Sequence, residues 1–288
     1  MFSVTHHALR ITSALRANML SLSCNPFRSV NIGIGVSRMI AKLMLALLAL
    51  GQVKTVEATI VNPSEWSHYE VVRASAPITI DGTITKKEWG RATPITRFSD
   101  VFQPERQMKY PTVAMMMWDD KYLYIAYECW EDDIYATMTK HDDFVYTEQV
   151  MEVFIDPEGQ GRHYFEIDLS PRNVVIDLMV ISPSFLGLAA TQSRYDVIGL
   201  LHATRVKGTL DNRNDKDEKW TAELAIPWSN FMGRKVNVPP KDGDSWRMNI
   251  FRTCGPKPWP GNDQFLSWSK SPGVFHQPKN FGVVTFRR

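Results

Sequence analysis

Alternation of apolar and polar residues in two neighbouring segments is the feature that most limits how this chain can fold. Met151–Asp156 and His163–Leu169 both alternate, and the turn-rich stretch Pro157–Arg162 separates them. Period-two alternation is typical of a β-strand with one buried face, and two such runs joined by a turn predict a β-hairpin. The chain is therefore expected to build at least part of its core from antiparallel strands.

The register of this hairpin decides which charged residues meet. If Asp156 pairs with Arg162, then Glu152 lies opposite Glu166 on one face, and the apolar residues form the other face. Like charges directly across two strands destabilise a sheet, so this pair requires compensation. Ligand hydroxyls, a cation or a nearby arginine would provide it. The alternative is a solvated outer face with a slightly different register.

Further short strands follow the same pattern along the chain. Helical periodicity is scarce, and Thr85–Arg91 is the best helical candidate, while the polar stretch Asp211–Lys219 is predicted to be a loop. Regular short strands without crossover helices predict an all-β fold, a sandwich of two antiparallel sheets. The other predicted strands are Val113–Trp118, Tyr122–Trp130, Val174–Ile181, Trp220–Ile226, Trp246–Arg252, Gln264–Trp268 and Phe281–Phe286.

Composition places the chain among ordinary globular proteins. It has 288 residues, of which 44% are hydrophobic and 22% charged, and its formal net charge is +2. A near-neutral charge without a basic stripe argues against nucleic acid as a partner. The oligomeric state is not indicated by these features.

The N-terminal segment has the composition of a targeting sequence. The first acidic residue is Glu57, and the apolar run Leu43–Leu50 is too short to span a bilayer. Arg38 and Lys42 precede this run, and a small-residue site that ends at Ala58 follows it. This order predicts a secretory signal peptide, and a transit peptide is the alternative.

These observations predict three parts. Residues 1–58 form a leader with the signal peptide at 39–58, residues 59–74 form a lead-in segment, and residues 75–288 form the β-sandwich domain. Cleavage would leave a mature chain with no transmembrane segment. That chain is expected to be secreted, periplasmic or at the cell surface.

Cysteines and acidic doublets raise two further questions. Cys129 and Cys254 would remain after cleavage, either as a disulfide or as free buried thiols.

The doublets Asp119-Asp120 and Asp142-Asp143 lie beside strand ends, and so does Asp132-Asp133. Oxygen-rich loops of this kind suit calcium, although simple solvation explains such doublets as well. No cofactor is required, and calcium is the one candidate ion.

Five short motifs, taken in order, resemble the family 9 carbohydrate-binding modules of the DOMON-like β-sandwich group. The resemblance covers roughly residues 75 to 286. The motifs are Ile80-Asp81-Gly82 with Trp89, Trp118-Asp119-Asp120-Lys121-Tyr122-Leu123-Tyr124, Glu152-Val153-Phe154-Ile155-Asp156-Pro157, Glu223-Leu224-Ala225-Ile226-Pro227-Trp228, and Pro278-Lys279-Asn280-Phe281-Gly282.

The resemblance implies a non-catalytic domain that binds a mono- or oligosaccharide and serves cellulose- or xylan-type polysaccharide catabolism. The family's two sugar-stacking rings fall at Tyr146 and Phe275, and its strand glutamate falls at Glu152. Glu166 stands where a sugar-binding member has arginine, and Arg252 is a candidate for the balancing charge. Tyrosine and phenylalanine replace the tryptophans of sugar-binding members, which predicts weak binding.

Three other functions compete with this one. Glu152 and Glu166 would be about 5 Å apart in the predicted register, a spacing that a retaining glycoside hydrolase could use. However, the chain has no GxSxG, HExxH or P-loop motif. A haem-binding domain would use axial ligands such as Met115–Met117, Met179 or His163. A surface protein that only mediates contacts is the third alternative.

Overall fold

The computed structural model describes residue 62 and residues 65–183, 189–255 and 264–288. The predicted signal peptide at 39–58 lies outside the described residues. All described residues belong to one compact unit, Ala58–Arg288. Within the described part of the chain, no helix is both long enough and apolar enough to cross a membrane.

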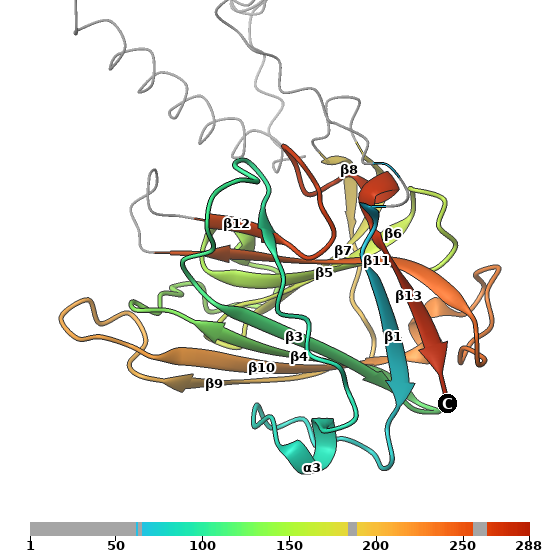
Figure 1. Ribbon diagram of the computed structural model, residues 1–288, viewed down its shortest axis with the longest axis horizontal. Helices are drawn as coiled ribbons and strands as arrows, with labels where there is room; N and C mark the ends of the chain where they lie inside the picture. The colour runs from blue at the N-terminus through green and yellow to red at the C-terminus, as the bar shows by residue number, and fades with distance from the viewer. Residues whose placement is uncertain (1–61, 63–64, 184–188, 256–263) are drawn as a thin grey trace, which may run out of the picture. The chain divides into compact units, whose positions relative to one another are not determined.

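Strands dominate this unit, and the helices are short (Figure 1). The helical elements are α3 (Lys86–Trp89), η2 (Val145–Thr147), η3 (Trp228–Phe231) and η4 (Pro278–Asn280). The strands are β1 (His68–Arg73), β2 (Ser99–Asp100), β3 (Thr112–Trp118), β4 (Tyr122–Trp130), β5 (Val150–Asp156), β6 (Tyr164–Leu169), β7 (Val175–Pro183), β8 (Ala189–Arg194), β9 (Leu201–Lys207), β10 (Lys219–Pro227), β11 (Ser245–Cys254), β12 (Gln264–Ser267) and β13 (Gly282–Arg287).

The strands form one continuous sheet, which confirms the all-β prediction. Its order is β8-β7-β6-β5-β11-β13-β1-β3-β4-β10-β9, with β12 paired to β11 and β2. Every described pair is antiparallel except those of β1, which runs parallel to both β13 and β3. Residues 59–74 were predicted to be a lead-in, but His68–Arg73 form this strand at the centre of the order. Figure 1 shows β1 and β13 side by side on the right, and in the strand order they lie between the group β3, β4, β10 and β9 and the group that contains β5 and β11.

The main hydrophobic core draws on both halves of this sheet. Met151, Val153 and Ile155 of β5 pack in the same cluster as Ile125 of β4 and Leu224 of β10. Because successive side chains of a strand point to opposite faces, the other residues of β5 lie on the outer face of the sheet. The tryptophans that were predicted to pack in or beside the core are all buried: Trp89, Trp118, Trp220 and Trp246.

The hairpin of β5 and β6 forms as predicted, but the predicted register is wrong by two residues. Glu152 lies opposite Asp168, and Glu166 lies opposite Phe154. The connecting turn is wider than expected, with positive φ angles at Gly159 (63°) and Gly161 (74°). Since a shift by two residues keeps every side chain on its face, the division into a core face and an outer face survives the error.

The two cysteines do not form a disulfide. Cys129 of β4 and Cys254 of β11 are both free and fully buried. Burial raises the pKa of the Cys129 thiol to about 12, so this thiol stays protonated and unreactive at neutral pH. The disulfide prediction is therefore wrong, and the alternative of free buried thiols is correct.

The buried carboxylate of Glu223 connects helix α3 to strand β10. Thr85 caps α3, and the Glu88 carboxylate accepts a hydrogen bond from the Thr85 hydroxyl at 2.7 Å. Glu223 of β10 is fully buried and accepts from the indole N–H of Trp89 at 2.8 Å. It also accepts from the backbone N–H of Gly82 at 2.8 Å, where φ is 80°. Two of the sequence motifs thus meet at one side chain.

Replacement of Glu223 by alanine is expected to destabilise the fold strongly. The change leaves the buried N–H groups of Trp89 and Gly82 without an acceptor, and each such group costs about 1–3 kcal/mol. Urea unfolding of Glu223→Ala should therefore show a loss of about 2–5 kcal/mol. The matched control is Glu218→Ala, because Glu218 is 51% exposed and pairs with Lys207 at the surface. Equal stability of both variants would contradict the assigned role.

Candidate functional site

Three acidic side chains meet on the outer face of β5 and β6. Glu152 and Asp168 are cross-strand neighbours, and Glu166 lies in the next row of the same face. One oxygen of each carboxyl group lies within 4.8 Å of the others. Glu152 and Glu166 are 3% exposed, and Asp168 is fully buried. We call Glu152, Glu166 and Asp168 the carboxyl cluster.

Burial determines the protonation of this cluster. It raises the pKa of Glu152 well above the usual value, and the nearby Glu166 raises it further. The pKa of Asp168 is also raised well above its usual value, first by burial and then by the two glutamates. Neither carboxyl oxygen of Asp168 has a hydrogen-bond partner within the described part of the chain. Glu152 and Asp168 therefore favour the protonated form at pH values where an exposed acid is ionised.

Aromatic rings lie on the β11 side of the cluster. Phe251 of β11 is the cross-strand neighbour of Glu152. The Phe275 ring stacks on it, with 4.3 Å between the ring centroids and 12° between the planes. Phe265 and Phe102 continue the series, with 5.2 Å between their ring centroids, and Phe102 is 44% exposed. The predicted ring at Phe275 thus lies beside the predicted glutamate, with one of its two faces already covered.

A second aromatic pair lies on the β7 side. Tyr146 of η2 is half-buried against a cluster of apolar residues that includes Val150 of β5 and Ile176 of β7. The centroid of its ring is 5.6 Å from that of Phe144, which is 42% exposed. Because the strand order is β7-β6-β5-β11, the carboxyl cluster lies between this pair and the Phe275 group.

A histidine covers part of the same face. His276 Nδ1 lies 2.8 Å from the Tyr164 hydroxyl, and its Nε2 lies 3.9 Å from a carboxyl oxygen of Glu166. Burial lowers the pKa of His276 to about 4. The imidazole is therefore neutral at pH 7 and does not compensate the acids.

Arg252 does not balance the glutamates, so this part of the predicted site is wrong. Its cross-strand neighbour is Met151, which places it on the opposite face of the sheet from Glu152. The guanidinium is fully buried and pairs with Glu131 at 2.9 Å. It also donates to the Thr112 hydroxyl at 2.6 Å. Arg252 thus links β11 to β3 and to the end of β4.

Most of the predicted calcium ligands already stabilise turns. Asp119 accepts hydrogen bonds from the backbone N–H of Lys121 and the hydroxyl of Tyr124, each at 2.7 Å. Asp120 pairs with Arg73. Asp143 accepts from two backbone N–H groups of its own turn. Asp142 is the exception, since it lies close to His141, Asp177 and Asp196, which together could hold a metal ion. Calcium binding stays a prediction.

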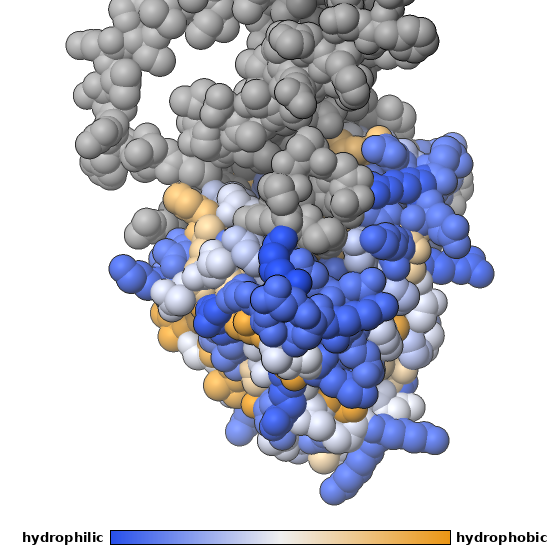
Figure 2. All heavy atoms as spheres, turned by 90° about the vertical axis from the view of Figure 1, so that its left-hand side faces the viewer, coloured by the Kyte–Doolittle hydropathy of each residue, from blue (hydrophilic) through white to orange (hydrophobic). Residues whose placement is uncertain are grey.

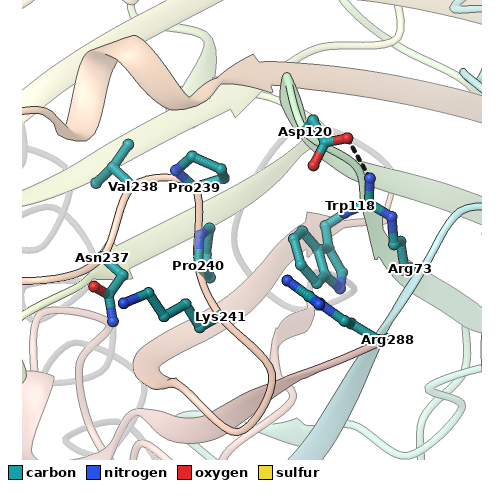
Figure 3. Close-up of a pocket in the computed structure, with 9 residues that line it drawn as sticks. All are labelled: Arg73, Trp118, Asp120, Asn237, Val238, Pro239, Pro240, Lys241 and Arg288. Carbon is teal, nitrogen blue, oxygen red and sulfur yellow. Dashed lines mark hydrogen bonds and ion pairs between the residues drawn. The ribbon is translucent and has the colours of Figure 1, made fainter.

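A surface pocket of about 310 Å³ lies at the end of β1 and the β3–β4 turn (Figure 3). Three of its lining side chains are basic, those of Arg73, Lys241 and Arg288. Arg73 is engaged with Asp120, as the dashed line in Figure 3 shows. The pocket contains none of the predicted sugar-binding residues.

Sequence reasoning missed several residues of the candidate site. Asp168 carries the same signal as Glu166, because it follows two positions later in an alternating strand. Phe144 lies two residues before Tyr146, but no sequence pattern marks it as a site residue; only its exposure in the structure does. Phe102 and His276 reach the site through ring contacts between segments that are far apart in the sequence, so no local sequence pattern marks them.

Comparisons with known proteins identify the family and the fold. Residues 99–286 match carbohydrate-binding family 9. A protein from Arthroderma benhamiae named "Extracellular protein" is 28% identical over 195 residues, which cover 64% of this chain and 82% of that protein. A family 9 module from Caldicellulosiruptor kristjanssonii, solved with cellotriose, has a TM-score of 0.51 and 14% identity; the match covers 77% of this chain and 94% of the module.

Two further solved structures have the same fold. A candidate carbohydrate-binding protein from Bacteroides uniformis has a TM-score of 0.58 and 18% identity, over 77% of this chain and 99% of that one. The Caldicellulosiruptor kristjanssonii module solved with glucose has a TM-score of 0.50 and 14% identity, over 77% of this chain and 96% of the module.

The raised pKa values make stability depend on pH. Above the ordinary carboxyl pKa of about 4, Glu152 and Asp168 hold more protons in the folded protein than in the unfolded chain, so their contribution to the free energy of unfolding falls as pH rises. Glu152→Gln should remove part of this fall and raise the melting temperature at pH 8 more than at pH 4. The exposed Glu105→Gln should leave the profile unchanged. A Glu152→Gln profile with the slope of the wild type would contradict the assignment.

Proposed function

Because the chain belongs to carbohydrate-binding family 9, and its function is therefore non-catalytic carbohydrate binding, we propose where and how it binds the sugar. The ligand lies on the outer face of β5 and β6, between Tyr146 and Phe275. The observation that carries this proposal is the carboxyl cluster with aromatic rings on both of its sides.

Stacking supplies most of the proposed affinity. The C–H faces of a sugar pack on aromatic rings, and a few fixed polar groups bind its hydroxyls. Phe144 and Phe102 are the exposed rings at the two sides, so they extend the surface that Tyr146 and Phe275 begin. Glu152 is only 3% exposed, so it contacts one edge of the ligand at most. This arrangement supports weak binding of a mono- or oligosaccharide.

The polysaccharide class is also part of the proposal. The neighbouring structures contain cellotriose and glucose, which supports a β-glucan-type ligand and a role in cellulose or xylan catabolism. The glycosidase alternative is not favoured, because the family is one of binding modules rather than enzymes. The haem alternative is not favoured either, because the family is one of carbohydrate-binding modules, and two of its candidate ligands, Met116 and Met117, are fully buried in different hydrophobic clusters.

Calorimetry with cello- and xylo-oligosaccharides tests the site. The wild type should bind with a Kd of the order of millimolar, or about 4 kcal/mol. Tyr146→Ala and Phe275→Ala should lose detectable heat, and Phe144→Ala should weaken binding. Tyr122→Ala is the control, because Tyr122 is also a partly buried aromatic residue but packs in the cluster around Trp89.

Two outcomes separate the site from the function. If the wild type binds a sugar and neither Tyr146→Ala nor Phe275→Ala changes its affinity, the proposed site is wrong. If Tyr122→Ala weakens binding as much as they do, general destabilisation explains the loss.

Export of the protein is a second part of the proposal. The basic start and short apolar run of Met39–Ala58 support it, and so does the name of the Arthroderma benhamiae relative. N-terminal sequencing of protein from the medium or periplasm should begin near Thr59. Retention in the cytoplasm with an intact leader would contradict this prediction.

A further inference from the structure

A second group of ligating side chains lies apart from the carboxyl cluster. His141 and Asp142 precede η2, Asp177 lies on β7, and Asp196 follows β8. One nitrogen or oxygen atom from each of these four residues lies within 4.8 Å of the others. We call them the histidine–aspartate cluster. The cluster gathers three carboxyl groups around one imidazole, a set of side chains that a cation can bind.

Distances in this cluster fit a small metal ion. His141 Nε2 lies 3.4 Å from Asp177 Oδ1, 3.4 Å from Asp196 Oδ1 and 3.6 Å from Asp142 Oδ1. Tetrahedral zinc with bonds of about 2.0–2.1 Å separates its ligand atoms by about 3.3–3.4 Å. The imidazole therefore lies at nearly the right distance from every oxygen before any metal binds.

Asp177 provides an independent observation that points to a ligand. It is 1% exposed, and its Oδ1, the oxygen that faces His141, has no hydrogen-bond partner within the described residues. Its other oxygen, Oδ2, accepts from the backbone N–H of Val197. Buried side-chain oxygens are rarely left unsatisfied in native proteins, so such a group requires an explanation. A cation at the centre of the cluster would satisfy it.

The backbone holds both loops of the cluster against β7. The N–H of Asp142 donates to the carbonyl of Val175 at 2.9 Å. The N–H of Tyr195 donates to the carbonyl of Asp177 at 3.4 Å. These bonds hold Asp142, Asp177 and the residue before Asp196 in place, so the backbone around the cluster is already ordered without a metal ion. His141 is 54% exposed and Asp196 is 77% exposed, which leaves the cluster open to an ion from solvent.

We propose that His141, Asp142, Asp177 and Asp196 bind a divalent transition-metal ion, and that Zn²⁺ fits best. An imidazole nitrogen with carboxylate oxygens is a common ligand set for zinc. Calcium instead takes six to eight oxygen ligands. The site also differs from the calcium doublet expected from the sequence, because Asp143 is engaged by its own turn.

This metal site is separate from the proposed sugar site. Ile176 lies opposite Asp168 on the face of the carboxyl cluster, whereas Asp177 lies opposite the core residue Ile167. Neighbouring residues of a strand point to opposite faces, so the two sites use opposite faces of β7. The metal therefore does not need to touch the sugar, and each site can be tested without the other.

Calorimetry of the metal-free full chain with ZnCl₂ tests the proposal. The wild type should show one zinc site that His141→Ala and Asp196→Asn each weaken at least tenfold. Both substitutions are at exposed positions, so the fold should survive, and melting curves without metal would check this. His68→Ala is the control, because His68 is exposed at the start of β1, outside the cluster. Visible absorbance of the Co²⁺ form should show the strong bands of a tetrahedral site in the wild type and in His68→Ala, but not in His141→Ala or Asp196→Asn.

Three outcomes would overturn the proposal. The first is a wild type that binds no zinc. The second is zinc binding that His141→Ala and Asp196→Asn leave intact, which would assign it to other residues such as His6 and His7. The third is calcium binding at this cluster without zinc binding, which would identify an oxygen-only site.

Discussion

The parallel pairing of β1 is the constraint on which the rest of this structure depends. His68–Val72 pair with β13, and Val72 and Arg73 pair with the end of β3. A strand with partners on both sides makes one sheet of two groups of strands that are otherwise antiparallel. The fully buried Val71 contributes to the core that both groups enclose. The curvature of this one sheet therefore decides which face of β5 and β6 is inside.

The two faces of that sheet have taken different chemical roles. Arg252 and Met151 point inward, where the guanidinium has protein acceptors for its protons. One residue along each strand, Phe251 and Glu152 point outward to the carboxyl cluster and the rings. Alternation alone separates a structural arginine from a glutamate of the carboxyl cluster. A change of one residue in register would exchange them.

Local alternation predicted most of the strands, and it divided β5 and β6 correctly into a core face and an acidic outer face, because these features depend on neighbours in sequence; it missed β1, β2, β8 and β9. The register failed at a turn with positive φ angles at Gly159, Gly161 and His163, where residue counting assumes a tighter connection. β1 was missed because its partner β13 is more than 200 residues away, as in the pair His68 and Val283. The histidine–aspartate cluster joins His141 to Asp196, and only the pairing of β7 with both loops brings them together.

The last strand of the sheet, β9, has consequences for how copies of this protein behave at high concentration. An unpaired strand edge is a template on which another chain can add and start a fibril. β9 ends the strand order and carries Arg205 and Lys207, which pair with Asp81 and Glu218 of the same chain. A second copy that approached this edge would meet like charges and would have to break those ion pairs. Figure 2 shows mainly hydrophilic residues on the side of the molecule that it presents, with apolar residues only in small groups. The charged side chains of β9 and their ion pairs thus protect this edge of the sheet against edge-to-edge polymerisation.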